Sequence, residues 1–422
     1  MFGYLVPLAI SLGLATAAFA AEPVTADKIL SGIGADVAAS RGIAASEVVE
    51  RTNFDKKKKN QTCAALLSAG IEASKGLVTW HDRLRLNVAS DLNGQTFSLI
   101  SPGRFEPADP SGLLRPGATS SGEYSVFLQN LMSGDANDFQ PVAMQQTSLG
   151  QLAAVGFSVP ASKSHWMYAA EGKGAAPIAY KGSFLASPDS GELKRLIMVA
   201  ENTGDACLLQ YTLDYAPVKV GDRNLILPQS SVMEGIYTDG TESRSETHYS
   251  GWNLPEAKKP APPAPKTTPP PAGLRINAKL QTVIDGNTSA IGDAVTAVVK
   301  SDVKDKTSST VLVHAGDRLH GRIARFEEYT LPYEKVGAVR EGIDPKWQVG
   351  IVFETLESGT GTQAMEQAIS LTPIDDGDQT AHDNPTTPGE LAKLRPAGGA
   401  FYIVYKKTLT LDQKFETDWE TR

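Results

Sequence analysis

Short segments in which apolar and polar residues alternate recur along most of the chain, and this pattern is typical of β-strands. In residues 83–90, for example, Leu84, Leu86 and Val88 alternate with polar neighbours. Successive side chains of a strand point to opposite faces of a sheet, so these three share one face. We therefore expect an antiparallel sheet of many strands, curled around its apolar face. Comparable segments occupy residues 96–101, 153–160, 165–170, 176–187, 193–200, 207–220 and 223–228.

A few segments predict helices or turns instead. Residues 25–52 carry apolar side chains on a polar, alanine-rich background, which predicts an N-terminal helix. A short helix is expected over residues 124–131. Asn93-Gly94 predicts a hairpin between the segments 83–90 and 96–101, because Asn and Gly readily adopt the backbone angles of a tight turn.

A proline-rich segment divides the chain. Eight of the 19 residues in 255–273 are proline, which fixes the backbone and removes an amide donor. The segment should be an extended spacer that spans up to about 60 Å, or else a docking site for a proline-binding groove or for peptidoglycan. A chain of 422 residues also exceeds the usual size of one domain. We therefore expect a domain over 21–254 and another over 274–422.

Residues 274–422 predict the second and smaller β-rich domain. Gly316 suits a tight turn between two strands, and Gly321 predicts a bend or bulge. The expected fold class is thus mainly β, with a curled half-barrel sheet and a few helices, then a linker, then a small barrel-like domain. The segments that predict its strands are 274–284, 291–299, 311–323, 350–357, 368–374, 400–406 and 408–419.

The first residues are typical of an export signal. Residues 4–19 are apolar and uncharged, and they end in the small-x-small pattern Ala18-Phe19-Ala20. The alternative is an uncleaved membrane anchor, but the stretch is shorter than the roughly 20 residues of a spanning helix and contains Pro7. We expect residues 1–20 to be a signal peptide and the mature protein to be periplasmic or extracellular.

Cys63 and Cys207 are the only cysteines of the chain. An exported protein meets an oxidising compartment, which favours a disulfide between them. Such a bridge would contribute roughly 4–5 kcal/mol by restricting the unfolded chain. The alternative is a pair of separate buried thiols, because free cysteine is often buried.

Composition and motifs restrict the chemistry further. The net charge of -8 argues against nucleic acid as a partner, because a basic surface is needed to replace phosphate counterions. No phosphate-binding glycine loop, nucleophile motif or metal-binding HExxH pattern is present, so no cofactor or metal is expected. His314 and His320 flank a predicted turn, and the acidic segment 375–383 offers a calcium-loop alternative to a solvated loop.

Several turn and strand motifs within residues 30–230 resemble a family of bacterial envelope proteins. That family is similar to the half-barrel lipoprotein carriers of the outer-membrane lipoprotein-sorting group, which hold acyl chains on a concave apolar sheet. The resemblance implies a curled sheet with an apolar concave face. The motifs that carry it lie at 121–124, 180–184, 187–196, 214–215 and 227–228.

Two segments of the C-terminal part resemble a second family. Residues 292–299 and 311–323 are similar to strands of the β-barrel subunit of type IV secretion and conjugation envelope complexes. His314-Ala315-Gly316 stands where that family usually has Pro-Lys-Gly. The resemblance implies a barrel-like fold in the C-terminal part and an envelope protein as partner.

These features predict an exported, non-enzymatic protein of the cell envelope. It would bind a lipid or another apolar ligand, or it would dock to an envelope assembly. The alternative is a hydrolase of cell-wall or extracellular polymer whose catalytic carboxylates the sequence does not single out. The side chains expected on the apolar face are Leu84, Leu86, Val88, Phe157, Ile178, Phe184, Leu196, Met198, Leu208 and Tyr211.

Overall fold

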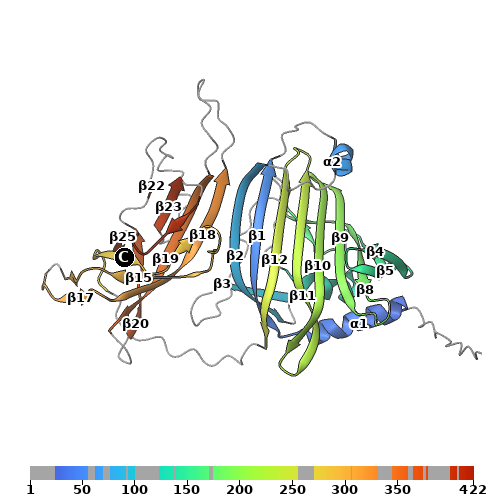
Figure 1. Ribbon diagram of the computed structural model, residues 1–422, viewed down its shortest axis with the longest axis horizontal. Helices are drawn as coiled ribbons and strands as arrows, with labels where there is room; N and C mark the ends of the chain where they lie inside the picture. Colours follow the sequence, from blue (N-terminus) through green and yellow to red (C-terminus); the bar gives the residue numbers. More distant parts are fainter. Residues whose placement is uncertain are drawn as a thin grey trace, which may run out of the picture.

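The protein is mainly β, as expected, and most described strand pairings are antiparallel (Figure 1). No helix among the described residues is long and apolar enough to cross a membrane. Residues 1–20 and most of the linker lie outside the described part. The computed structural model describes residues 24–55, 62–69, 77–91, 94–99, 123–136, 138–170, 174–254, 270–305, 307–330, 345–359, 365–373, 377–378, 400–405 and 408–422.

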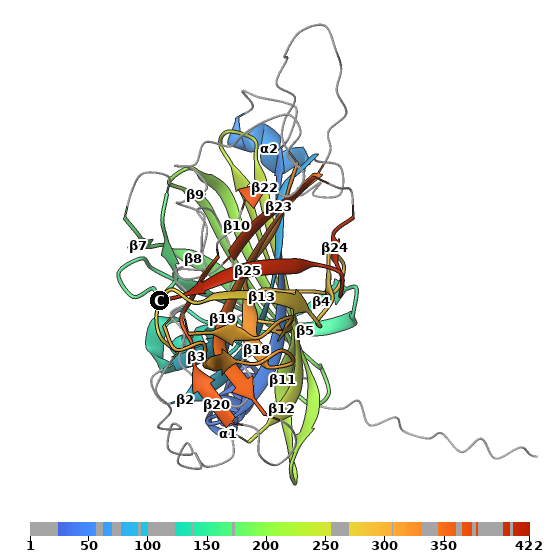
Figure 2. The same ribbon diagram turned by 90° about the vertical axis from the view of Figure 1, so that its left-hand side faces the viewer.

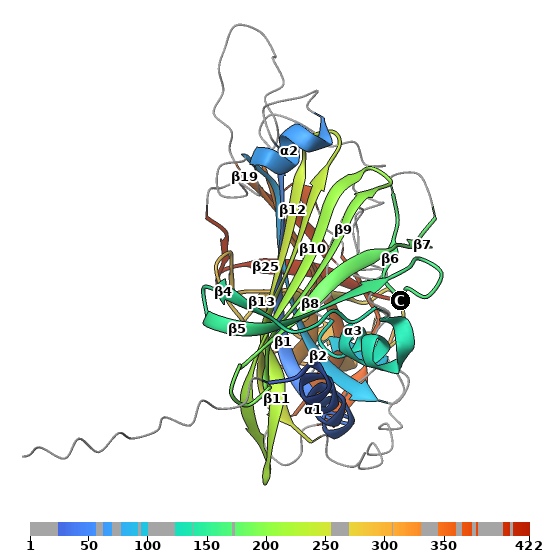
Figure 3. The ribbon, with the colours of Figure 1, turned by 90° about the vertical axis from the view of Figure 1, so that its right-hand side faces the viewer.

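Ten strands of the N-terminal part form one curved antiparallel sheet (Figures 1 and 3). Their order across the sheet is β4-β5-β8-β9-β10-β11-β12-β1-β2-β3. The strands are β1 (Ala44–Asp55), β2 (Leu77–Asp91), β3 (Gly94–Leu99), β4 (Ala143–Thr147), β5 (Gly150–Val159), β8 (Tyr180–Ala186), β9 (Leu193–Thr203), β10 (Ala206–Val220), β11 (Arg223–Tyr237) and β12 (Glu242–Asn253).

Two helical segments pack against the inner face of this sheet. Thr25 caps the N-terminus of helix α1 (Ala26–Ala39), and its side chain accepts a hydrogen bond from the Lys28 amide at 3.3 Å. Its apolar stripe packs with α3 (Val126–Asn130) and the π-helical turn η3 (Leu131–Asp135) against β5, β8, β9 and β10. Strands β6 (Met167–Tyr168) and β7 (Ala176–Pro177) form a separate small ladder.

The helix expected over residues 25–52 is only half right. Helix α1 ends at Ala39, Gly42 takes a left-handed φ of 73°, and β1 then starts at Ala44. Left-handed φ is easy only for glycine, so the chain turns there and does not continue as helix. The β-branched Val48 and Val49 lie in β1, a setting that such residues favour.

The disulfide between Cys63 and Cys207 is confirmed. Helix α2 (Cys63–Ala69) is joined by it to β10, with the two Cα atoms 5.2 Å apart. Leu66 of this helix is buried against Cys207 and Ile236. The bridge therefore fixes a short helix onto the sheet across 144 residues of sequence.

Strand ladders of the C-terminal part, which faces the viewer in Figure 2, connect in a ring that passes through the consecutive strands β20 and β21. One path leads from β13 through β15, β18 and β19 to β20, and the other from β13 through β25 to β21. Strands β20 and β21 follow each other directly, so the two paths meet. The ring strands are β13 (Arg275–Leu280), β15 (Ala294–Val299), β18 (Arg318–Thr330), β19 (Pro345–Ser358), β20 (Met365–Ala368), β21 (Leu371–Pro373) and β25 (Glu416–Thr421).

Shorter ladders complete the C-terminal part. Strand β23 pairs with β19, and β22 pairs in parallel with β23. The bulge predicted at Gly321 is confirmed, because the β18–β19 register shifts between His320 and Gly321. The remaining strands are β14 (Ile284–Asp285), β16 (Val303–Lys304), β17 (Val311–Val313), β22 (Gly377–Asp378), β23 (Ala400–Tyr405) and β24 (Thr410–Leu411).

The two parts of the chain lie side by side and are joined through β2 and β18. Residues Trp80 to Asp82 of β2 pair with Glu327 to Tyr329 of β18. One hydrophobic cluster also contains side chains of both parts, among them Leu84 from β2 and Phe326 from β18. The boundary at the proline-rich linker stays a prediction, but the two sides of that boundary share a core.

This shared core leads to a prediction about cleavage. If a specific protease site replaces residues 259–266 and the purified protein is cut there, the two fragments should stay associated. Separation would expose the apolar surfaces of the shared core to water, and this costs a free energy of roughly 25 cal/mol per Å² of apolar surface. Gel filtration of cut and uncut protein should give the same elution volume, and separation should require denaturant. Separate elution in native buffer would contradict this expectation.

Candidate functional site

The residues expected on one apolar face are buried or half-buried, but they belong to three hydrophobic clusters. Leu84, Leu86 and Val88 lie in the cluster that both parts of the chain share. Leu208 packs beside the disulfide, because it is three positions from Tyr211 and so points to the other face of β10. The other six lie in the cluster that α1 and α3 complete, namely Phe157, Ile178, Phe184, Leu196, Met198 and Tyr211.

Aromatic side chains fill the inner side of the sheet. The rings of Phe157 and Phe184 are 4.8 Å apart, and those of Trp166 and Tyr180 are 5.3 Å apart. Gly182 makes room for this packing, since a β-carbon there would lie 2.4 Å from the Phe157 ring. Between α1, α3 and β11 a cavity of about 20 Å³ remains, which is space for about one water molecule.

A larger groove of about 410 Å³ lies at the ends of β5, β8 and β9. Lys181 and Glu201 face each other across it, with Nζ and Oε1 3.1 Å apart. Both side chains are well exposed, so this ion pair contributes little to stability. The groove is open to solvent, Asp138 also lines it, and its one cation, Lys181, already pairs with Glu201.

A buried ion pair lies on the inner face of β1 and β2. The Nε atom of Arg51 donates to Asp82 at 2.8 Å and its Nη2 atom at 2.5 Å, and both side chains are almost fully buried. The guanidinium also lies 5.5 Å from the centre of the Trp80 ring. Two parallel hydrogen bonds and a ring contact are the geometry that a buried charge pair needs to offset its lost hydration.

Glu47 brings a second acidic group into this interior. Its side chain has no exposed surface and lies beside Leu86 of β2 and Tyr249 of β12. Neither carboxyl oxygen has a hydrogen-bond partner among the described residues. Burial, and then the nearby charge of Glu123, raise the pKa of Glu47 well above its usual value. Both effects disfavour the ionised form.

A hydroxyl network lies close to Glu47. The hydroxyl of Tyr211 donates to the main-chain oxygen of Glu123 at 2.6 Å. Ser231 lies 3.2 Å from the hydroxyls of both Tyr211 and Tyr249. Burial raises the pKa of Tyr249 as well, so its hydroxyl stays protonated. The network is a structural element that ties β10, β11 and β12 to the segment before α3.

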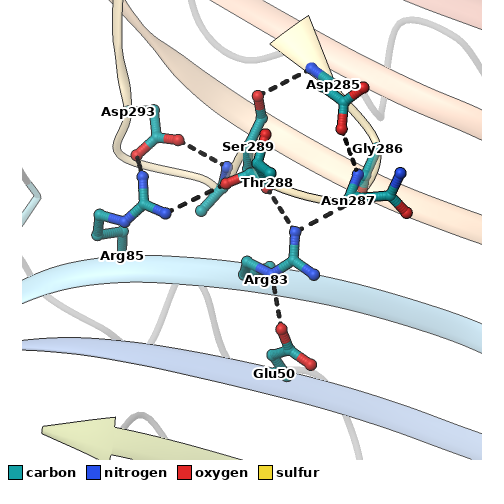
Figure 4. Close-up of polar contacts among 10 residues, drawn as sticks. Glu50, Arg83, Arg85, Asp285, Gly286, Asn287, Thr288, Ser289 and Asp293 are labelled. Carbon is teal, nitrogen blue, oxygen red and sulfur yellow. Dashed lines mark hydrogen bonds and ion pairs between the residues drawn. The ribbon is translucent and has the colours of Figure 1, made fainter. Parts of the chain in front are cut away.

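Polar contacts between the two parts of the chain gather around two arginines of β2 (Figure 4). Arg83 donates to Glu50 Oε1 at 2.8 Å and to the main-chain oxygen of Ser289 at 3.2 Å. Arg85 forms an ion pair with Asp293 and donates to the main-chain oxygen of Thr288 at 3.2 Å. The loop between β14 and β15 is thus held by side chains that point away from Leu84 and its core.

Main-chain contacts reinforce this joint. The amide of Ile291 donates to Arg83 O at 2.8 Å, and the amide of Arg85 donates to Ile291 O at 2.8 Å. On the other side, Gly292 donates to Ile323 of β18 at 2.8 Å. Gly292 has a φ of 98°, and a β-carbon there would lie 2.5 Å from Arg85 O. The segment Ile291-Gly292 therefore lies between β2 and β18 where these two strands move apart, and it forms main-chain hydrogen bonds to both.

The histidines considered from the sequence do not form a common site. His320 lies 2.7 Å from Glu357, and His314 lies 4.0 Å from Asp317. Strand β17 pairs with β16 and β18 pairs with β15, so these histidines do not face each other across a hairpin. Within the described residues no three metal-binding side chains gather, and most of 375–383 lies outside them.

The end of the sheet farthest from the C-terminal part has a different surface (Figures 1 and 3). Strand β4 pairs only with β5 among the described strands, and most of its side chains are exposed. Phe139, Met144 and Leu149 are 39%, 51% and 51% exposed, and they are half of the six exposed large apolar side chains among the described residues. We call Phe139 to Leu149 the β4 edge.

The β4 edge also lacks charge. Residues 139–162 contain no Asp, Glu, Lys or Arg. Free strand edges normally carry charged residues or proline that prevent pairing with other chains. No sequence motif marks this surface, and its only signal in the sequence is the absence of charge. An uncharged strand with a free backbone edge can add a strand from another chain.

The chain matches no protein-family model, no curated protein and no solved structure. The two resemblances described from the sequence therefore stay predictions. The function has to be inferred from the chemistry and geometry of the chain itself.

Arg83 should be a major contributor to the joint between the two parts. Arg83→Met removes a largely buried cation and leaves Glu50 and two main-chain oxygens without their donor. We therefore expect the free energy of unfolding to fall by about 2–4 kcal/mol. Lys300→Met is the control, because the exposed Lys300–Glu416 pair should contribute about 0–1 kcal/mol. Urea unfolding followed by tryptophan fluorescence measures both, and equal losses would contradict the assignment.

Glu47 should make stability depend on pH. Its pKa is raised in the folded state, so ionisation in the unfolded state favours unfolding once the pH exceeds the ordinary value of 4.5. The difference in unfolding free energy between Glu47→Gln and the wild type should therefore shift in favour of the variant with rising pH. The shift is at most about 1.4 kcal/mol per pH unit. Urea unfolding from pH 4 to 8 measures it. The exposed Glu416→Gln serves as control, and a constant difference for Glu47→Gln would contradict the prediction.

Proposed function

We propose that the chain is an exported, non-enzymatic protein of the cell envelope that docks to a partner through the β4 edge. The observation that carries this proposal is the presence of exposed apolar side chains on and next to an uncharged strand, one edge of which pairs with no described strand. Main-chain groups of such an edge provide affinity, and the flanking side chains Phe139, Met144 and Leu149 provide specificity.

Docking is favoured over carriage of an apolar ligand by the packing of the inner sheet. The side chains that would line a ligand cavity pack against one another, against α1 and α3, or against the C-terminal part. A pocket for an acyl chain or similar ligand needs about 300–1,000 Å³. The cavity of about 20 Å³ between α1, α3 and β11 is far smaller than that. The groove of about 410 Å³ is large enough, but it is open to solvent and three charged side chains, Asp138, Lys181 and Glu201, line it, which does not suit an acyl chain.

Two features support export. Residues 4–20 have the composition of a cleaved signal, and the Cys63–Cys207 disulfide suits an oxidising compartment. A disulfide that joins α2 to β10 across most of the N-terminal part also suits a protein that must persist outside the cytoplasm. The proposed location is therefore the periplasm or the extracellular space.

Site-directed photo-cross-linking tests the docking site. A benzophenone amino acid replaces Met144 in one variant and Val283 in the other, because both side chains are about half exposed and only Met144 lies on β4. After expression in the envelope and irradiation, we expect a discrete adduct from position 144 and none from position 283. The recovered chain should begin at Ala21 and carry no free thiol in denaturant.

Two results would contradict the proposal. The first is the same adduct pattern from both positions, or none from position 144. The second is a lipid that co-purifies with the protein in equal molar amount, measured by native mass spectrometry, since this would favour carriage over docking. A chain recovered with Met1 intact in the membrane fraction would contradict the cleaved signal peptide and favour an uncleaved membrane anchor.

A further inference from the structure

We propose that the partner at the β4 edge is a second copy of this chain, paired antiparallel with β4 about a two-fold axis at Gln145. This inference rests on the proposed function and names its partner. It would join the two curved sheets into one continuous sheet, edge to edge.

The hairpin geometry determines which backbone groups of β4 are free. Thr147 and Gly150 close a two-residue turn, and in such a hairpin the closing pair is hydrogen-bonded. Hydrogen-bonded and non-bonded pairs then alternate, so Gln145 also directs its backbone groups toward β5. Met144 and Gln146 direct their N–H and C=O groups to the free edge.

These free groups fit the free groups of an identical strand. In an antiparallel register centred on Gln145, Met144 lies opposite Gln146 of the partner subunit, and the reverse pair forms by symmetry. Each such pair exchanges two main-chain hydrogen bonds. The two copies of Gln145 meet at the axis, and an amide side chain carries both a donor and an acceptor, so it can pair with its own copy.

Charge favours a second copy at this surface over other surfaces of the molecule. The chain has a net charge of -8, so two copies repel each other at most orientations. Residues 139–162 add no charge to the contact, and no like charges meet across the axis. Met144, which is 51% exposed in the single chain, would be covered by the partner strand.

The size of the contact determines its strength. A pairing of five-residue strands should bury less than the roughly 1,000 Å² typical of a stable interface. We therefore expect a weak dimer with a dissociation constant in the micromolar range. The main-chain groups at the open edge determine the register in which the two strands pair. The small buried area makes the dimer reversible.

Charge-reversal at the axis tests this arrangement with the full chain purified from the envelope fraction. Gln145→Lys places two lysines directly opposite each other, and Gln145→Glu places two carboxylates there. Each variant alone should dimerise at least about tenfold more weakly than the wild type. An equimolar mixture of the two variants should recover dimerisation, because each interface then pairs a lysine with a carboxylate. Sedimentation velocity from about 1 to about 200 μM measures all three samples.

Gln151→Lys is the matched control, because Gln151 is an exposed residue of β5 on the same hairpin. Two lysines there would be about three strand spacings, or about 14 Å, apart, beyond the screening length of about 10 Å at 0.1 M salt. This variant should dimerise like the wild type. Loss of dimerisation in Gln151→Lys, or no recovery in the mixture, would overturn the two-fold register.

A monomer at every concentration would overturn the second copy as partner. The cross-link from position 144 then separates the two proposals. An adduct with twice the mass of the chain supports self-pairing. An adduct with a different protein, from a chain that stays monomeric, would overturn this inference and leave the docking function in place. Absence of any adduct would overturn both.

Discussion

Along one edge β2 pairs with β1 over nearly its whole length, and along the other edge three separate segments follow one another. Strand β18 pairs with Trp80 to Asp82, Ile291 pairs beside Leu84, and β3 pairs from Leu86 onward. Every backbone group of a buried strand needs a partner, because an unpaired one costs about as much as a lost hydrogen bond. The central strand of the molecule thus obtains its partners from both parts of the chain.

Successive side chains of β2 point to opposite faces of the sheet, and both faces contact the C-terminal part of the chain. Leu84 and Leu86 point into the shared hydrophobic cluster, whereas Arg83 and Arg85 point to the loop between β14 and β15. The apolar face contributes most of the free energy that holds the two parts together, because the hydrophobic effect is non-directional and scales with the apolar area buried. The arginines fix the register, because their donors fit particular main-chain oxygens of that loop.

Buried polar groups on β1 follow from this arrangement. The inner row that crosses β12, β1 and β2 contains Ser245, Arg51 and Asp82, with a complete ion pair at its centre. Removing one member of such a pair costs far more than the pair itself contributes. Glu47 is the contrast, since its carboxyl group is buried without a described partner and is better tolerated in the neutral form. Strand β1 therefore carries two buried polar side chains: Arg51, which is paired with Asp82, and Glu47, which has no described hydrogen-bond partner.

Sequence reasoning found the strands whose inner residues are large and apolar, such as those of β9 and β10. It missed β12, because the inward residues there are Ser243, Ser245 and Thr247, and small hydroxyl side chains give no apolar alternation. Two cysteines and a predicted export signal made the disulfide one of two alternatives, and the structure shows that the disulfide is the correct one. The division of the apolar residues among three clusters was not, because it depends on which elements cover each face, and that is a tertiary property.

The two ends of the N-terminal sheet present the same physical problem. A strand at the end of a sheet has a row of main-chain donors and acceptors that must find water or another strand. At the end next to the C-terminal part, β3 covers β2 only from Leu86 onward, and the rest of that β2 edge pairs with β18 and the segment around Ile291. At β4 no described strand is added, and the charges that would keep other chains away are also missing. Within the chain, added strands pair with the edge of β2. We propose that a strand of a second chain pairs with the edge of β4 in the same way.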